Sequence, residues 1–177
     1  MKKLVIVING KGGTGKDTLC NFVSQNYKTM NVSSIDPIKD MAKIIGWDEA
    51  KDKKSRKLLS DLKRIATEYN DYPTQYILKK YVEFLDSDYE ILFVHIREPE
   101  QIHLFCKKIG YKALTLLIRR KMEVEIFGNS SDDDVEKYHY DYIYNNDKPL
   151  FQAENDFMNF FRNIYKNNKG IDYESII

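Results

Sequence analysis

Apolar residues occur in short runs, and the longer stretches between them carry apolar residues at helical spacing. The runs at 4–8, 91–94 and 113–118 are almost entirely apolar. Strands that are apolar on both faces are typical of the centre of a parallel sheet covered by helices on both sides. Together with two weaker segments they predict strands at 3–8, 31–35, 90–96, 113–118 and 141–145. The helical spacing predicts helices at 15–27, 37–46, 54–70, 73–86, 98–109 and 150–165.

Strands and helices that alternate along the chain indicate a three-layer α/β fold with a five-stranded parallel sheet flanked by helices. With 177 residues the chain is of ordinary size for one domain, so we expect a single domain over 1–177. Pro37, Pro73 and Pro99 each fall near a predicted first helical turn, where the missing N–H has no cost. We expect the tail at 166–177 to be frayed.

The segment 10–18, with the sequence GKGGTGKDT, directly follows the first predicted strand. Its GxxxxGK pattern is a P-loop: glycines let backbone N–H groups turn inward toward a phosphate, and the following helix adds its positive end. Lys16 supplies a charge that reaches the β- and γ-phosphates. The motif predicts ATP binding by Gly10, Lys11, Gly12, Gly13, Thr14, Gly15, Lys16, Asp17 and Thr18. The alternative is a glycine-rich turn without a ligand.

Asp17 stands where a P-loop usually carries the serine or threonine that binds magnesium. Mg²⁺ prefers hard oxygen ligands, either directly or through water. We therefore expect Asp17 to be the metal residue and Thr18 to hydrogen-bond the α-phosphate, with ATP and Mg²⁺ as the cofactors.

The composition of the chain argues against nucleic acid and membranes as its partners. Lys plus Arg is 28 and Asp plus Glu is 27, which leaves a net charge of +1. A balanced charge gives no field for nucleic acid or a membrane surface, and no apolar run is long enough to span a bilayer. We expect a cytoplasmic protein whose partner is a small molecule, whereas the oligomeric state cannot be read from the sequence.

The string at 11–16, KGGTGK, resembles the loop of partition and septum-positioning ATPases, which carry a lysine before the two glycines. Those proteins have Ser or Thr in place of Asp17 and a strand that ends in an acidic switch motif. Here the strand ends Val94-His95-Ile96-Arg97. A switch-type ATPase, in which Lys11 reaches a partner's phosphate, stays open as the alternative function.

The GKDT string at 15–18 is typical of bacteriophage-type deoxynucleoside monophosphate kinases and the related phosphomevalonate kinases. Further segments resemble motifs of this group in the same order along the chain: 36–39 its DPLK, 56–68 its RxLLQxxGTE, 96–100 its DxRxPNE, 129–132 its HxSE and 145–147 its ND turn. The resemblance covers about residues 1–150. It implies a P-loop kinase with a short mobile lid near 119–140 that phosphorylates a nucleoside or deoxynucleoside monophosphate. Phosphomevalonate and dephospho-coenzyme A remain alternative acceptors.

Three positions depart from the group's pattern. His95 replaces the aspartate of the third-strand motif, Asn129 replaces the lid histidine, and Lys63 stands where the group has glycine. If that aspartate holds a metal-bound water, Asp36 or Asp17 must carry the metal in its place.

Phosphoryl transfer requires alignment and positive charge around the moving group, so charged residues at strand ends are the catalytic candidates. We assign this role to Lys16, Arg119, Arg120 and Asp36. In the kinases that the chain resembles, one arginine after the fourth strand lies near the base and the other bridges the transferring phosphate. The alternatives are a solvated surface pair for the arginines and a helix N-cap for Asp36.

Lys39, Arg56 and Arg97 are the candidates for binding the acceptor, because each follows or faces a strand end in the predicted fold. Lys39 lies at a helix amino terminus, which favours anions. Arg97 has an ion pair with Glu98 or Glu100 as its alternative. Arg56 and Arg64 lie eight residues apart on about the same face of a predicted helix, from which they could reach the acceptor nucleotide. The alternative is that they are only solvent-exposed, and this alternative is stronger for Arg64.

Overall fold

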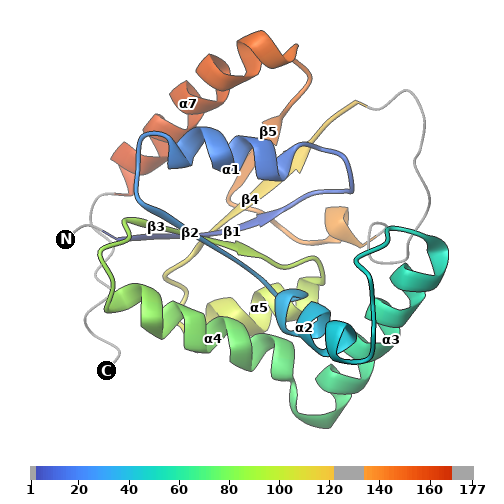
Figure 1. The fold of residues 1–177 in the computed structure, drawn as a ribbon. Helices are drawn as coiled ribbons and strands as arrows, with labels where there is room; N and C mark the ends of the chain where they lie inside the picture. Colours follow the sequence, from blue (N-terminus) through green and yellow to red (C-terminus); the bar gives the residue numbers. More distant parts are fainter. Residues whose placement is uncertain (1–2, 122–133, 169–177) are drawn as a thin grey trace.

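The computed structural model describes residues 3–121 and 134–168, and these form one parallel sheet between layers of helices (Figure 1). The strands are β1 (Leu4–Asn9), β2 (Thr29–Ser33), β3 (Ile91–His95), β4 (Leu114–Arg119) and β5 (Tyr142–Asn145). Their order in the sheet is β2-β3-β1-β4-β5, and every neighbouring pair is parallel. The predicted five-stranded parallel sheet is confirmed, with β2 beginning two residues earlier than expected.

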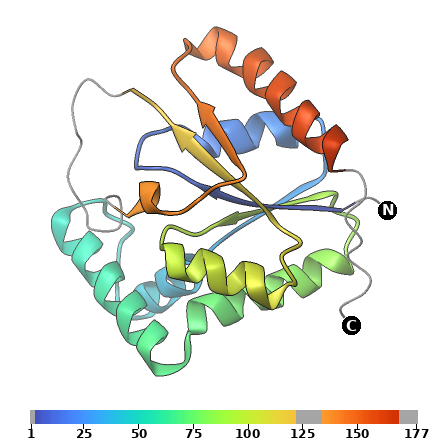
Figure 2. The same cartoon turned by 180° about the vertical axis from the view of Figure 1, so that it is seen from behind.

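Helices cover both faces of this sheet. They are α1 (Lys16–Ser24), α2 (Asp36–Ile44), α3 (Lys53–Asn70), α4 (Tyr72–Leu85), α5 (Pro99–Lys108) and α7 (Leu150–Asn167), with a short 3₁₀ helix, η1 (Val135–Lys137). Figures 1 and 2 show α1 and α7 on one face, α4 and α5 on the other, and α2 with α3 at the end where the strands finish. The three helix-starting prolines lie in the first turns of α2, α4 and α5, as predicted.

The central strand β1 is buried along its whole length and divides the core into two halves. Leu4, Ile6 and Ile8 belong to the half that packs under α1 and α7. Val5 and Val7 face the other way, into the half formed with α4 and α5. Because successive side chains of a strand point to opposite faces, one continuous apolar run supports both layers.

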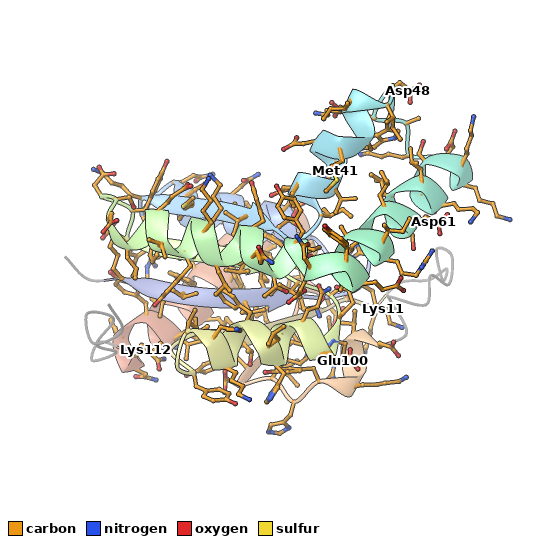
Figure 3. The ribbon with its side chains drawn as sticks, turned by 90° about the horizontal axis from the view of Figure 1, so that it is seen from below. Lys11, Met41, Asp48, Asp61, Glu100 and Lys112 are labelled. Carbon is orange, nitrogen blue, oxygen red and sulfur yellow. The ribbon has the colours of Figure 1, made fainter. Side chains whose placement is uncertain are left out.

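The order of the strands indicates at which end of the sheet a ligand would bind. After β1 it passes over β3 to the edge strand β2, and after β3 it passes over β1 to β4. Ligands of such sheets bind outside the carboxyl ends of the strands, where the crossover direction reverses. In Figure 3, Lys11 and Glu100, which follow β1 and β3, lie at one end of the molecule, and Lys112, which precedes β4, lies at the other.

Parts of two expected segments lie outside the described residues. These are 122–133 of the expected lid, including the Asn129 motif, and 169–177 of the expected tail. Helix α7 continues to Asn167, inside the expected tail, and Asn168 closes it by donating its Nδ2–H to Ile164 O at 2.9 Å. Within 3–121 and 134–168, no helix combines the length and the apolar character needed to cross a membrane.

Helix α7 offers a direct test of this packing. Phe157 is fully buried against the sheet, whereas Phe151 on the same helix is 78% exposed. We expect Phe157→Ala to lower the free energy of unfolding by about 3–5 kcal/mol, because it removes a buried ring and leaves a cavity. Phe151→Ala should change it by less than about 0.5 kcal/mol. Urea unfolding measures both, and equal losses would contradict the assigned packing of α7.

Candidate functional site

The loop at 10–15, between β1 and α1, lies against two other parts of the molecule. Gly10, Gly13 and Gly15 have φ values of +151°, +80° and +88°, a region that favours glycine. A Cβ on Gly10 would lie 2.4 Å from the carbonyl oxygen of Ile118 in β4. A Cβ on Gly15 would lie 2.6 Å from Asn146 Nδ2. The loop therefore needs glycine at both positions for its conformation and for its close contacts.

Two buried asparagines, Asn9 and Asn146, fix the loop to the neighbouring segments. Asn9 Oδ1 accepts the Gly10 N–H at 2.8 Å, and Asn9 Nδ2 donates to Arg97 O at 3.0 Å and to Tyr140 Oη at 2.7 Å. Asn146 Nδ2 donates to Thr14 O at 2.9 Å. Buried amides that use their donors and acceptors in this way hold a single arrangement. The loop is thus tied to the end of β3, to the segment before β5 and to the turn after β5.

Lys16 is the first residue of α1, and its side chain folds back over the loop. Its ammonium group donates to Gly10 O at 2.5 Å and to Lys11 O at 3.0 Å. A phosphate oxygen makes a stronger, charge-assisted hydrogen bond than a neutral carbonyl does. Lys16 therefore lies at the loop, and exchanging its carbonyl partners for the oxygens of a polyphosphate would be energetically favourable.

The residues of this loop fit a nucleoside triphosphate. Gly10, Gly12, Gly13 and Gly15 carry no side chain, so the loop offers mainly main-chain groups next to the amino end of α1. Asp17 and Thr18 lie exposed in the first turn of that helix. Among the described residues, no three His, Cys, Asp or Glu side chains converge on a point. Mg²⁺ usually keeps several waters and takes one or two carboxylates together with phosphate oxygens, and Asp17 would supply such a carboxylate.

Asp36 is not the N-cap of its helix, in contrast to the alternative drawn from the sequence. Helix α2 begins at Asp36 itself, and Ile35 occupies the cap position without a side-chain hydrogen bond. Asp36 Oδ2 instead accepts the backbone N–H of Ser33 at 2.7 Å, which fixes the bend after β2. The Ser34 N–H donates to His95 O at 3.1 Å, so this bend lies beside the end of β3.

His95 lies among the charged groups of the site. Burial lowers the pKa of His95 below its usual value, and the charges of Lys16 and Lys39 lower that pKa further, while Asp17 and Asp36 oppose the shift. The imidazole is therefore neutral at neutral pH. A neutral ring nitrogen is a poor ligand for Mg²⁺. The carboxylate missing at this position is thus not replaced in kind by His95.

Arg119 and Arg120, at the end of β4, both line a hollow of about 420 Å³ beside the loop. Lys11, Thr14, Glu136 and Asp147 are among its other lining residues. The Arg119 guanidinium donates to the Glu136 carboxylate through Nε at 3.0 Å and through Nη2 at 2.5 Å. The two arginines are exposed, as a surface pair would be, but they border the same space as the phosphate loop.

Lys39 and Arg56 come together at a second hollow, of about 280 Å³, between α2 and α3. Trp47, Glu49, Ala50, Lys51 and Leu59 complete its lining. Arg97 lines neither hollow, although its carbonyl oxygen holds Asn9 at the loop. The structure thus brings Lys39 and Arg56 together at one hollow, whereas Arg97 lies apart from them at the end of β3.

Lys63 and Glu98 form the bond between α3 and the start of α5. The Lys63 ammonium lies 2.7 and 2.6 Å from the two Glu98 carboxylate oxygens and 3.2 Å from Ser34 Oγ. The side chain of Lys63 is 14% exposed and that of Glu98 is 32% exposed, so the pair is partly shielded from water. Lys63 therefore links α3 to the segment before α5 and to the turn after β2.

Sequence reasoning missed several of these residues: Asn9, Trp47, Lys63 with Glu98 as a pair, Glu136 and Tyr140. Asn146 was within reach, because it lies in the ND turn at 145–147. Trp47, which directly follows the helix-ending Gly46, carried a local signal as well.

No family model matches this sequence, and no curated protein matches it. Solved structures do match its fold. TT1252 from Thermus thermophilus is 12% identical, with a TM-score of 0.53 over 96% of this chain and 100% of that one. A protein from Chloroflexus aurantiacus, named provisionally as a kinase, is 12% identical, with a TM-score of 0.57 over 94% and 98%. Shikimate kinase from Bacteroides thetaiotaomicron is 11% identical, with a TM-score of 0.51 over 92% and 98%.

At these identities the likeness shows the fold alone. The chain has the three-layer P-loop fold that shikimate kinase also has, with a five-stranded parallel sheet flanked by helices. The loop at 10–15 lies at the carboxyl end of its central strand β1.

Two glycines give a matched test of the loop. Gly10→Ala places a Cβ against Ile118 O, so we expect ATP binding to be lost together with part of the stability. Gly46 also has a positive φ, +89°, but a Cβ there meets nothing within 4 Å. Gly46→Ala should cost only about 1 kcal/mol of unfolding free energy and leave ATP binding intact. Calorimetric titration with ATP and thermal melts measure both effects. Tight ATP binding by the Gly10→Ala protein would contradict the assigned loop.

Proposed function

We propose that this protein is an ATP- and Mg²⁺-dependent phosphotransferase that phosphorylates a nucleoside or deoxynucleoside monophosphate. The observation that supports the proposal is a pair of hollows that are each lined by cations. One, with Arg119 and Arg120, borders the phosphate loop, and the other, with Lys39 and Arg56, lies between α2 and α3. Donor and acceptor would then meet over the amino end of α1.

Lys39 relates the two places to each other. It lines the α2–α3 hollow, and its charge acts on His95 beside the loop, on which Lys16 and Asp17 also act. The proposal requires a phosphate bound near Lys39 to lie in line with the γ-phosphate of ATP at the loop. Direct transfer requires this alignment of acceptor and donor phosphates.

The proposed roles follow from charge and position. The loop amides and Lys16 hold the β- and γ-phosphates of ATP, and Arg120 offers a planar guanidinium to the transferring group. Asp17 would hold the magnesium ion, which neutralises phosphate charge when bound. Asp36 keeps the bend after β2 in place and presents its carboxylate beside His95.

The acceptor site is proposed to bind a monophosphate, because its cations outnumber its acids. Glu49 is the acid that lines it, and that carboxylate is already paired with Lys43 at 2.7 Å. Lys39, Lys51 and Arg56 therefore give this hollow an excess of positive charge, which favours an anion. Arg97, which follows β3, is proposed to bind the phosphate of the acceptor from the strand end.

The main test is ADP release, coupled to an indicator reaction, with ATP and Mg²⁺ and a panel of ribo- and deoxyribonucleoside monophosphates. Phosphomevalonate and dephospho-coenzyme A belong in the panel as the alternative acceptors. We expect release that depends on a nucleoside monophosphate. Lys16→Met should lower turnover roughly 10²–10³-fold because it removes a charge aimed at the transferring phosphate. Its melting temperature should stay close to that of the wild type.

Turnover of the Lys16→Met protein at the wild-type rate would contradict the catalytic assignment. ADP release that needs no acceptor, together with ATP-dependent dimers that Lys11→Ala abolishes, would favour the switch-type ATPase.

Arg56 and Arg64 lie eight residues apart on α3, and variants at the two positions distinguish acceptor binding from a general effect of surface charge. Arg56 lines the hollow, whereas Arg64 pairs with Glu68 on the exposed side at 3.0 Å. We expect Arg56→Ala to raise the KM for the acceptor about tenfold, because a hydrogen bond to a charged group is lost. Arg64→Ala should leave that KM within about twofold, since exposed ion pairs contribute little. Steady-state kinetics at saturating ATP compare them, and equal effects would contradict the acceptor site.

A further inference from the structure

The hollow beside the loop at 10–15 contains two acids among its cations. The described residues that line it include the cations Lys11, Arg119, Arg120 and Lys121 and the acids Glu136 and Asp147. A carboxylate close to a polyphosphate repels it, so an acid in such a place calls for an explanation. Asp147 has one, because its Oδ1 accepts the backbone N–H of Lys121 at 2.6 Å and so holds the chain after β4. Glu136 requires another.

The Glu136 carboxylate meets the Arg119 guanidinium along one edge. Arg119 Nε lies 3.1 and 3.0 Å from the two carboxylate oxygens, and Nη2 lies 2.5 Å from Oε2. A contact through two nitrogens fixes the plane of the guanidinium, which a single hydrogen bond does not. The pair uses Nε and Nη2, so it does not engage the donors of Nη1.

Glu136 is itself held in place by the short helix η1. Its neighbour Val135 is fully buried, and Val135 O accepts the hydroxyl of the buried Tyr140 at 2.9 Å. The same hydroxyl accepts Asn9 Nδ2–H at 2.7 Å, and Asn9 Oδ1 accepts the Gly10 N–H. The turn that carries Glu136 is therefore tied to the asparagine that also fixes the loop at 10–15.

The main chain of Arg119 is fixed by the sheet. Arg119 is the last residue of β4 and pairs with Asn145 of β5, and its carbonyl oxygen accepts the Asn146 N–H at 2.7 Å. The long side chain is thus held at its root by the sheet and at its tip by Glu136. A side chain that is already ordered loses less rotamer entropy when a ligand binds.

The exposure of the pair separates a structural role from a role in ligand binding. The side chains of Arg119 and Glu136 are 45% and 41% exposed, and exposed ion pairs contribute little to folding. If the pair only stabilised the fold, its loss would be almost silent. If Glu136 only bordered the hollow, its negative charge would weaken the binding of a polyphosphate. If Glu136 orders Arg119 for the ligand, its loss weakens that binding.

We propose that Glu136 is a positioning residue, which holds the Arg119 guanidinium at the wall of the hollow so that Arg119 contacts ATP. Glu136 acts through Arg119 and does not itself bind the nucleotide. This inference rests on the proposed function, in which ATP is the phosphoryl donor bound at the loop, and it names the residue that prepares the donor site.

A double-mutant cycle on ATP binding tests the inference without turnover. The full chain is titrated calorimetrically with Mg²⁺ and a non-hydrolysable ATP analogue. We expect Arg119→Ala to raise the Kd at least tenfold, because a hydrogen bond from a charged group is lost. Glu136→Gln should raise it about three- to tenfold. In the Arg119→Ala protein, Glu136→Gln should change the Kd less than about twofold, since the group through which it acts is gone.

Asp134→Asn is the matched control. Asp134 directly precedes η1, pairs with Lys137 at 2.5 Å and is not among the residues that line the hollow. The substitution removes the same charge two residues away, so we expect the Kd to stay within about twofold of the wild-type value. The melting temperatures of the Glu136→Gln and Asp134→Asn proteins should lie within about 3 °C of that of the wild type.

Four results would overturn the role of Glu136. These are unchanged or tighter binding by the Glu136→Gln protein, an equal loss from Glu136→Gln with and without Arg119, wild-type affinity of the Arg119→Ala protein, and an equal loss from Asp134→Asn. Each of them leaves the phosphotransferase in place. ADP release with none of the acceptors would overturn the proposed function, and the Kd comparison would then still decide whether Glu136 prepares Arg119. A wild-type protein that does not bind the ATP analogue would overturn both.

Discussion

The contact between the loop at 10–15 and the end of β4 is the constraint on which the rest of the site depends. Gly10 lies so close to Ile118 O that no Cβ fits, and Asn9 and Asn146 hold the loop at that distance. The contact is possible because β1 is buried on both faces and is paired with β3 and β4 on either side. A rigid core therefore positions a loop made almost entirely of main chain. This arrangement suits the recognition of phosphate, which requires inward-pointing N–H groups more than side chains.

The hollow between α2 and α3, where we propose that the acceptor binds, is organised differently. Helices α2 and α3 lie beyond the strand ends and join the core through the Lys63–Glu98 pair and through Ser34. Breaking such a shielded pair by removing one partner leaves a charge without its counterpart and costs more than an exposed pair does. The pair thus ties α3, which carries Arg56 and Leu59 of the hollow, to the segment before α5.

Much of the fold was predictable, because local pattern and tertiary structure agree. The apolar runs that become β1, β3 and β4 are buried on both faces, and the prolines mark the starts of α2, α4 and α5. β2 was placed two residues late because it is an edge strand whose exposed Asn31 breaks the apolar pattern. The loop and Lys16 were visible as a motif. Asn9, Glu136 and Trp47 were not, since each acts through partners that are distant in the sequence or through a cavity that only the folded chain creates. Asp36 shows the same limit: its bond to Ser33 competes with the helix cap that its position next to Pro37 favoured.

Transfer of a phosphoryl group directly from ATP to an acceptor, between the two hollows, is the central claim. Incubation with ATP labelled at its γ-phosphate and a nucleoside monophosphate, followed by separation of the products, tests it most directly. We expect the label to appear in a nucleoside diphosphate in step with the formation of ADP, and inorganic phosphate to stay at background because the acceptor receives the group. Label that appears only as inorganic phosphate with every acceptor would contradict it.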